Sequence, residues 1–431
     1  MLIHVVQQGE TIETIANYYG ISVMRLISDN GLKRTENLVI GQSLVIARPE
    51  VTYTVKAGDN LADIAEAHNI TIMQLYRNNP FLSERESIYA GETIVIKYNT
   101  NGMITTHGNT VPFIDMNILK KTLPYLTYLS ILNFTATDKG EIITYYDEAE
   151  TIQTAKEYGV MPLMLVTTLS IKGEANVGIA YDILINEEFQ NIQIENLLYL
   201  LEAKGYYGVN LSFEYINISN MRLYENYFNK IATSLSEKGY LIFATIGTNI
   251  MEVNGEINFE RIDYSLYNEV VHNVIFMDFK WATNITPPSP IISISNIEAF
   301  LNYVGTFISS EKQIIGIATV GYDWELPFSA GISSIYFLTQ ENAVDLARNV
   351  GATIQFDEIS KTPYFNYTMK RAGKEVAHIV WFVDARSENA ILNLIIQNQL
   401  NGIGIWNITV FNPQLWVIIN SQFEIEKVLM E

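Results

Sequence analysis

The chain has 431 residues, 48% of them hydrophobic, which is longer than one ordinary domain and enough to bury sizeable cores. The formal net charge of −20, without Lys or Arg clusters, argues against nucleic acid or an anionic membrane as partner and favours a neutral ligand such as a glycan. The chain contains no cysteine, which excludes disulfides and thiolate metal sites.

The N-terminus, MLIHVVQQGETIETIA, lacks a basic segment followed by an apolar run, so no signal peptide is predicted. No run approaches the ~18 apolar residues that a membrane span needs. The five histidines lack metal-ligand spacing, and no Gly-rich phosphate loop follows a predicted strand, so we expect neither a metal nor another cofactor. We also expect a monomer.

The first hundred residues contain two copies of one unit. HVVQQGETIETIA, from His4, aligns with YTVKAGDNLADIA, from Tyr53, and GQSLVI, from Gly41, aligns with GETIVI, from Gly91. The offset is 49 residues at the start (53 − 4) and 50 at the end (91 − 41), which is typical of duplicated modules. Each copy predicts a short strand, a Gly turn, two helices and a closing strand.

This pattern resembles the lysin motif (LysM), a βααβ module that binds glycans containing N-acetylglucosamine, such as peptidoglycan and chitin. The resemblance implies modules over residues 1–48 and 50–98, each with a shallow glycan groove between its first loop and the loop before its last strand. The implied contacts are Gly9, Glu10, Thr11 and the segment near Val39 and Ile40, and Gly58, Asp59, Asn60 and the segment near Tyr89 and Ala90. These residues can also simply form turns and helix N-caps. The short linkers predict that the modules lie close to the rest of the chain.

From about Met103 onward, short apolar strands alternate with longer helical stretches. Eight such strands with helical crossovers predict an α/β fold, a parallel (β/α)8 TIM barrel over residues 103–431. The segment 326–382, between the seventh and eighth strands, is too long for a plain connection and predicts a small α+β insertion. The predicted strands cover residues 103–108, 128–134, 160–169, 208–215, 241–247, 273–282, 313–324 and 401–409.

Polar residues and tryptophans gather at the predicted strand ends, where the chemistry of such barrels lies. In the fourth strand apolar residues alternate with a polar set that shares one face, Asn210, Ser212 and Glu214. A glutamate at a strand end indicates acid–base chemistry. Several tryptophans near an acid are typical of a platform on which the apolar face of a sugar stacks.

The barrel resembles glycoside hydrolase family 18, the chitinase-like family, and within it the spore cortex-lytic group, which has two LysM modules ahead of the barrel. The resemblance covers nearly the whole chain. Its markers, in chain order, are GVMPLMLVT (159–167), KGYYGVNLSFEYI (204–216), GYDWELPF (321–328), VWFVDARS (380–387) and GIGIW (402–406).

The resemblance implies that Glu214 protonates the glycosidic oxygen. The 2-acetamido carbonyl of the substrate is then the nucleophile, with an oxazolinium intermediate and net retention, so a second catalytic carboxylate is not required. The implied substrate-binding residues are Asn210, Ser212, Met277, Phe279, Trp281, Tyr322 and Trp406.

The chain departs from the family signature D-x-x-D-x-D-x-E, because Tyr207, Asn210 and Ser212 stand where the family has aspartates. The family's Asp at the position of Ser212 accepts a hydrogen bond from the acetamido N–H, and losing such a charged partner typically lowers the rate by about 10²–10³. Phe279 replaces the Tyr whose hydroxyl holds the acetamido oxygen, and Lys280 reverses a charge.

The residues leave two functions open. The first is an N-acetylglucosaminidase-type glycosidase, held by LysM modules on spore cortex peptidoglycan, with Glu214 as general acid. The second is a weakened or inactive, lectin-like glycan-binding protein on the same barrel, since a fold alone does not carry activity. Both imply peptidoglycan or another N-acetylglucosamine-containing glycan as partner. The resemblance implies a location in the spore coat or cortex, or at the cell wall.

Overall fold

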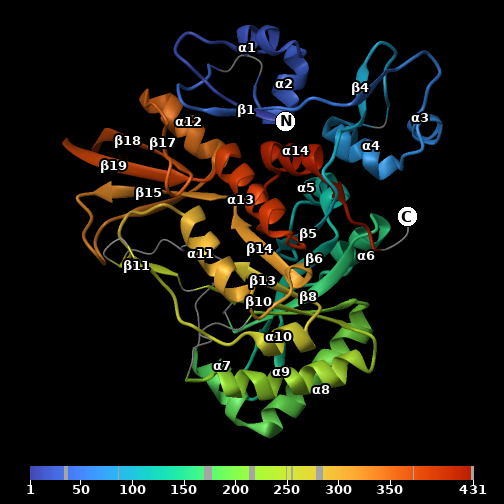
Figure 1. Cartoon of the computed structure of the whole chain (residues 1–431), viewed down its shortest axis with the longest axis vertical. Helices are drawn as coiled ribbons and strands as arrows, with labels where there is room; N and C mark the ends of the chain where they lie inside the picture. The colour runs from blue at the N-terminus through green and yellow to red at the C-terminus, as the bar shows by residue number, and fades with distance from the viewer. Residues whose placement is uncertain are drawn as a thin grey trace.

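The computed structural model describes residues 1–33, 37–85, 87–168, 177–212, 219–248, 250–253, 256–277, 285–371 and 373–428. Two small βααβ modules lie against one side of a barrel, and a separate sheet projects beside it (Figure 1). The first module consists of β1 (Leu2–Val5), α1 (Ile12–Tyr19), α2 (Val23–Asn30) and β2 (Ser43–Ile46). The second consists of β3 (Val51–Thr54), α3 (Leu61–Ala67), α4 (Ile72–Asn78), the 3₁₀ turn η1 (Pro80–Glu84) and β4 (Thr93–Lys97).

The two modules are built in the same way, as the repeat predicts. In each, the first strand pairs antiparallel with the last. Asn30 and its counterpart Asn79 are buried, and each side chain bonds both to a helix carbonyl and to the backbone of the closing strand, at Val45 and Val95 respectively. The asparagine shared by the two copies therefore fastens the second helix of each module to its closing strand.

Among the described residues, eight parallel strands close into a barrel, because β5 pairs with both β6 and β20. The predicted (β/α)8 fold is thus confirmed. The barrel strands are β5 (Met103–Thr110), β6 (Tyr128–Ala136), β8 (Met161–Thr167), β9 (Gly208–Ser212), β10 (Leu241–Gly247), β13 (Asn273–Met277), β14 (Gln313–Ala318) and β20 (Gly402–Trp406).

Helices surround this barrel, with α8 and α9 at the end away from the modules in Figure 1. The helical elements are α5 (Met116–Thr122), η2 (Leu123–Tyr125), α6 (Ala149–Glu157), α7 (Val177–Ile185), α8 (Glu187–Lys204), α9 (Met221–Ser236), α10 (Ser265–Val270), α11 (Ile294–Val304), η3 (Ser310–Lys312), α13 (Ala385–Asn398) and α14 (Pro413–Gln422). Short additional strands are β7 (Ile142–Thr144), β11 (Met251–Val253), β12 (Glu256–Asn258) and β21 (Glu424–Ile425).

The predicted seventh strand, 313–324, is wrong as a single element. The barrel strand β14 ends at Ala318, and the chain then leaves the barrel as β15 (Val320–Leu326). Strand β15 lies inside a five-stranded antiparallel sheet with β16 (Ile335–Thr339), β17 (Gln355–Asp357), β18 (Thr362–Arg371) and β19 (Lys374–Phe382), and α12 (Gln340–Val350) packs on it. We call β15–β19 with α12 the insertion. The apolar run continues across Thr319, so periodicity alone could not reveal the change of sheet.

The modules are packed onto the barrel rather than suspended from it, as the short linkers predict. Buried side chains of both modules belong to the same apolar core as the barrel, namely Val45, Ala47, Val95 and Tyr98. Helix α14 lies beneath both modules: Gln414 Nε2 donates to Asn30 Oδ1 at 2.9 Å, and Asn420 Nδ2 donates to Asn78 Oδ1 at 2.8 Å. Modules and barrel therefore share one hydrophobic interior.

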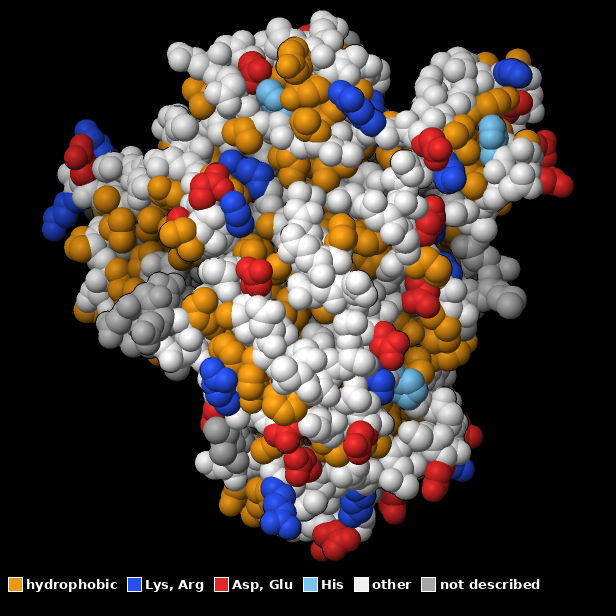
Figure 2. Space-filling model, viewed as in Figure 1, with side chains coloured by type: hydrophobic (Ala, Val, Ile, Leu, Met, Phe, Trp, Pro, Cys, Tyr) orange, Lys and Arg blue, Asp and Glu red, His pale blue; other side chains and the backbone are white. Residues whose placement is uncertain are grey.

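Surface charge is scattered on the face shown in Figure 2, where described Lys and Arg side chains lie among acidic and neutral ones and form no contiguous basic patch. Of the helices that the structure describes, none has the length and apolar composition to cross a membrane.

Glu388 is a carboxyl group buried completely within α13. Burial and the nearby charge of Asp384 together raise its pKa to about 8, although a 2.7 Å hydrogen bond from Asn412 Nδ2 opposes the shift. The folded chain therefore keeps this carboxyl protonated in a pH range in which the unfolded chain ionises it.

Glu388→Gln is expected to stabilise the chain increasingly as pH rises. A raised pKa in the folded state means that ionisation of the unfolded chain begins near 4.5 and lowers the stability of the wild type up to about pH 8. Glutamine cannot ionise. The difference in free energy of unfolding between Glu388→Gln and the wild type should therefore grow by at most about 1.4 kcal/mol per pH unit. Urea unfolding at pH 5, 6.5 and 8 measures the gap, and a gap independent of pH would contradict the expectation.

Candidate active site

The interior of the barrel changes from apolar to polar along its strands. Four fully buried side chains from different strands form an apolar layer, and they are Leu163, Phe243, Ile275 and Ile314. Nearer the carboxyl ends, the inward side chains of β5, β6, β9 and β10 are polar. The carboxyl ends of barrel strands are where catalytic groups of this fold are placed.

A hydrogen-bonded network joins these four strands. His107 Nε2 lies 2.7 Å from Ser130 Oγ, and Asn210 Nδ2 donates to Ser130 Oγ at 3.1 Å. Thr245 Oγ1 donates to Asn210 Oδ1 at 2.8 Å. His107, Ser130 and Asn210 are each 0% exposed, so the two bonds among them operate without competition from bulk water, while Thr245 is half-buried. The network fixes the end of β9 relative to its neighbours.

Burial lowers the pKa of His107 to about 3, so its imidazole is neutral at physiological pH. A neutral ring adds no charge to the interior. His107 is thus a core histidine.

The predicted site residues of the barrel separate into two levels. Ser212, Met277 and Trp406 are the last residues of β9, β13 and β20, and each is half-buried at the carboxyl end. Asn210 lies two residues below Ser212 with both ends of its amide engaged. Asn210 is 0% exposed, so its side chain lies within the barrel beneath the strand ends.

Met277 is positioned by a glycine of the next strand. Its backbone pairs with Gly316 of β14, and a Cβ at Gly316 would lie 1.7 Å from Met277 Sδ. Only a glycine leaves room for the thioether there, so β14 provides the surface on which Met277 rests.

Tyr322 and Trp324 lie on β15 in the insertion, and both are buried. The expectation that Trp324 stands at a barrel strand end is therefore wrong. Asp323, between them, accepts hydrogen bonds from Tyr367 Oη at 2.6 Å and His378 Nδ1 at 2.9 Å. Both donors lie in the insertion, so Asp323 has a structural role there.

Three predicted residues, Glu214, Phe279 and Trp281, lie outside the described part of the chain. The strands that precede them are described, and both end at the same rim: β9 at Ser212 and β13 at Met277, with β10 between them. Because the side-chain period along an extended strand is two, Ser212 and Glu214 share a parity in the sequence.

The predicted groove residues of the first module form a turn and a helix start. Gly9 has φ +85° in the turn after β1, and Thr11 caps α1 in a capping box. Burial alone would raise the pKa of Glu10, but hydrogen bonds from the Gln7 N–H and from His4 lower it.

The second module repeats this arrangement. Gly58 has φ +94°, and Asn60 caps α3. Hydrogen bonds from the Lys56 N–H and from Tyr53 Oη, each 2.8 Å long, lower the pKa of Asp59. Both first loops therefore form the turns and helix N-caps that the sequence also allowed. Their exposed residues, Gly9, Thr11, Gly58 and Asn60, also leave backbone and side-chain groups open to solvent.

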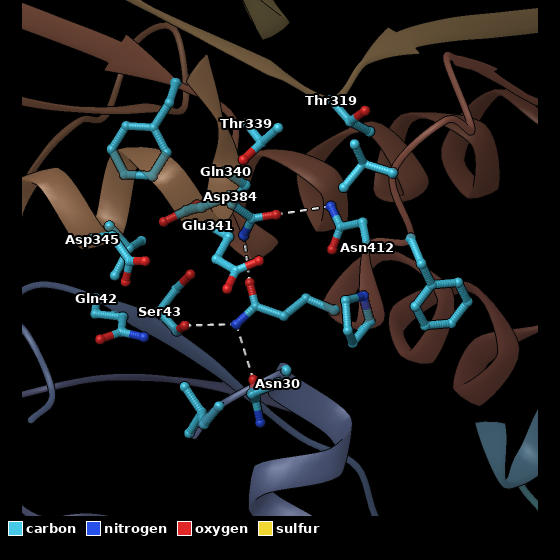
Figure 3. A pocket seen from close by; sticks show the side chains of 18 of the residues that line it. Asn30, Gln42, Ser43, Thr319, Thr339, Gln340, Glu341, Asp345, Asp384 and Asn412 are labelled. Atoms are coloured by element: carbon cyan, nitrogen blue, oxygen red, sulfur yellow. Dashed lines mark hydrogen bonds between the residues drawn. The ribbon is translucent and has the colours of Figure 1, made fainter. Parts of the chain in front are cut away.

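A cavity of about 250 Å³ lies elsewhere, where the first module meets α12 and the segment leading into α14. Figure 3 shows Asn30, Gln42 and Ser43 of the module on one side and Gln340, Asp384 and Asn412 on the other. An amide chain crosses this junction from Asn30 through Gln414 and Gln340 to Asn412. None of the predicted catalytic or substrate-binding barrel residues lines the cavity, so we interpret it as part of the module junction.

The interior network contains three residues that sequence reasoning missed, His107, Ser130 and Thr245. For Ser130 and Thr245 the available signal was parity, since each stands at an inward position of a mostly apolar strand, whereas the strand of His107, MITTHGNT, is largely polar and gives no such contrast. Among the described side chains, no group of three or more His, Asp or Glu residues is placed to hold a metal ion.

Comparison with known proteins agrees with this geometry. The family model of glycosyl hydrolases family 18 matches residues 94–410, and that of the LysM domain matches residues 4–47 and 53–97. The chain is 28% identical to the putative sporulation-specific glycosylase YdhD of Bacillus subtilis, with 99% of this chain and 100% of that one covered. It is 27% identical to the cortical fragment-lytic enzyme of Bacillus anthracis, with 98% of each covered.

Solved structures extend the likeness to the fold. The spore cortex-lytic enzyme SleL of Bacillus cereus superposes with a TM-score of 0.79 at 27% identity over 99% of both chains. A chitinase from Chromobacterium violaceum shares the barrel at 17% identity and a TM-score of 0.64. The resemblance to the spore cortex-lytic group is thus confirmed, and the findings favour a glycosidase over an inactive lectin. The chain belongs to family 18 of the glycosyl hydrolases, as a glycosidase that carries two LysM domains.

Proposed function

We propose that the chain hydrolyses the glycan strands of spore cortex peptidoglycan beside N-acetylglucosamine, by a retaining, substrate-assisted mechanism. Glu214 is the general acid and then the general base, and the acetamido carbonyl of the substrate is the nucleophile. The observation that carries the proposal is the rim formed by Ser212, Met277 and Trp406, supported from below by the buried network around Asn210. The relatives named as cortex-lytic enzymes, matched over nearly their whole length, supply the substrate class.

In this mechanism the strand end orients the acetamido group, and the tryptophans stack the sugar. Trp406 is the last residue of β20, and its backbone pairs with Asn109 of β5 and Ala318 of β14. Pairing on both sides fixes the backbone that carries the indole. An indole at that rim can hold the apolar face of a pyranose. Trp281 and Tyr322 complete the proposed substrate contacts.

Ser212 is the weak point of the proposed mechanism. The residue is half-buried beside Thr167, its pairing partner on β8, and its hydroxyl is neutral. A neutral group stabilises the positive charge of the forming oxazolinium less than a carboxylate does. We infer a slow enzyme whose rate is limited by this position and by Phe279.

Ser212→Asp is expected to raise turnover about tenfold, which needs only ~1.4 kcal/mol of transition-state stabilisation. Ser212→Asn is the matched control, since it adds the same bulk without the charge and should give no such gain. Phe279→Tyr restores a partner for the same acetamido group, so the double variant should be non-additive. The assay is release of a chromophore from an N-acetylglucosamine oligomer.

Mass spectrometry of products from purified cortex fragments tests the substrate directly. If every variant folds and binds the oligomer but none releases product faster than Glu214→Gln, the hydrolase proposal is wrong and the barrel acts as a lectin.

We further propose that the chain is associated with the spore cortex or cell wall and acts as a monomer.

A further inference from the structure

The two LysM modules differ in the second loop of the groove, although their first loops are alike. A Cβ added at Gly9 or at Gly58 would meet nothing within 4 Å, so both first loops face open space. In the second module Tyr89 is 60% exposed, and a Cβ at Gly91 would also meet nothing. The groove of the second module is therefore open on both sides.

The equivalent loop of the first module is occupied by the insertion. Val39, at the position of Tyr89, is 5% exposed and belongs to a small core made mainly of insertion residues, including Ala343, Phe365 and Phe382. A Cβ at Gly41 would lie 1.8 Å from the carbonyl oxygen of Ile354. The backbone of this loop is thus in direct contact with the segment that precedes β17.

Hydrogen bonds hold the loop in that position. The Ile354 N–H donates to the Ile40 carbonyl at 2.9 Å, and Arg386 donates to the Gly41 carbonyl at 3.2 Å. Arg348 Nε donates to the Asn37 carbonyl at 2.7 Å. Three backbone carbonyls that could otherwise accept from sugar hydroxyls or an acetamido N–H are therefore already bonded to protein.

The free loop of the second module has its aromatic ring arranged for a ligand. Arg85 forms two 2.6 Å hydrogen bonds with the Glu92 carboxylate, and its guanidinium lies 5.3 Å from the Tyr89 ring centroid. Glu92 also accepts from the Tyr89 N–H at 3.0 Å. Because Glu92 holds the Tyr89 backbone and Arg85 lies against the exposed ring, the ring loses little freedom when a sugar stacks on it.

We propose that the two modules have different roles: the second binds N-acetylglucosamine-containing glycan through Tyr89, and the first is a docking module whose groove is occupied by the insertion. The proposal rests on the proposed function for the class of glycan. The occlusion of the first module by the insertion is inferred from contacts within the protein alone, so it can be tested without any glycan.

The glycan experiment measures sedimentation of the full chain with purified insoluble peptidoglycan. The parent chain carries Glu214→Gln, so that it does not digest the peptidoglycan. Tyr89→Ala is expected to weaken apparent binding about tenfold, by loss of the stacking surface. Ile40→Ala removes the exposed side chain of the equivalent loop without touching its docked backbone, and should change binding less than twofold. A loss with Ile40→Ala as large as with Tyr89→Ala would overturn the division of roles.

Two further outcomes separate this inference from the function on which it rests. If the parent chain sediments and neither substitution alters it, retention belongs to the barrel and the inference is wrong while the proposed function stands. If the parent chain fails to sediment at all, peptidoglycan binding itself, and with it the proposed function, is wrong.

The docking arm compares Gly41→Ala with Gly91→Ala in the full chain. Both glycines have positive φ, +84° and +91°, so the backbone strain of an alanine is matched. Only Gly41 faces the Ile354 carbonyl, and the overpacking there should lower the thermal midpoint by about 1–3 °C more than Gly91→Ala does. Equal midpoints would show that the first module is not held against the insertion in solution.

Discussion

Glu214→Gln is expected to lower turnover of N-acetylglucosamine oligomers by about 10²–10⁴-fold and to leave the affinity for the oligomer and the thermal midpoint nearly unchanged. The amide keeps the size of the side chain but cannot protonate the glycosidic oxygen. We propose this role for Glu214 from its position in the signature, two residues after Ser212 in the sequence. Single-turnover release of a chromophore measures the chemical step.

The control for this substitution is Glu388→Gln, the same change at a buried carboxyl that is already protonated at neutral pH. It should leave turnover unchanged. The identity of Glu214 as the acid would be refuted by Glu214→Gln retaining a third or more of the wild-type turnover. A profile of kcat against pH adds a second check: His107 is neutral above about pH 3, so an ionisation seen near pH 6 cannot belong to it.

Asn210→Leu is expected to lower the free energy of unfolding by about 2–3 kcal/mol and kcat by roughly 10–100-fold. Leucine is similar in size but removes the bond from Asn210 to the buried Ser130 hydroxyl, which keeps only His107, and the acceptor of the Thr245 hydroxyl. The end of β9 would then lose its fixed register against β6 and β10. A shift of about 1 Å at the catalytic strand is enough for a rate loss of that size.

Asn273→Leu serves as the matched substitution at the opposite end of the barrel. Asn273 is also buried, at the start of β13, and makes one 3.4 Å bond to the Lys312 carbonyl. It should affect stability and leave kcat within twofold. Because Asn210 acts by positioning, its variant should change kcat more than KM. Equal effects on kcat from Asn210→Leu and Asn273→Leu would mean that the network has no role at the active site.

The barrel and the modules could be predicted because their signals are local in the sequence. The repeat is visible as matched residues such as Gly41 and Gly91, and most barrel strands are short apolar runs, β5 (MITTHGNT) being the exception. The turn from β14 into β15 could not be seen, since both strands are apolar and only one residue, Thr319, separates them. Which sheet a strand joins depends on partners far along the chain.

Periodicity predicted the candidate site only in part. Ser212, Met277 and Trp406 lie within the predicted strands 208–215, 273–282 and 401–409, but it is the structure that makes each of them the last residue of its strand. The bond between Ser130 and Asn210 joins residues 80 apart, and it follows from the register of a closed barrel rather than from either local pattern. Local sequence could not reveal the burial of Val39 either. An apolar residue beside a turn has the same sequence pattern whether it lines a groove or is covered by another part of the chain.

The shared interior of modules and barrel constrains how such a chain can be altered. Val45, Ala47, Val95 and Tyr98 pack into the same core as Trp416 of α14. Removing the first hundred residues would expose that apolar surface to water, so a truncated barrel should aggregate more readily than the intact chain. In this architecture, exchanging or deleting a LysM module also means redesigning the surface of α14, so recombination between chains would succeed only where module and helix are inherited together.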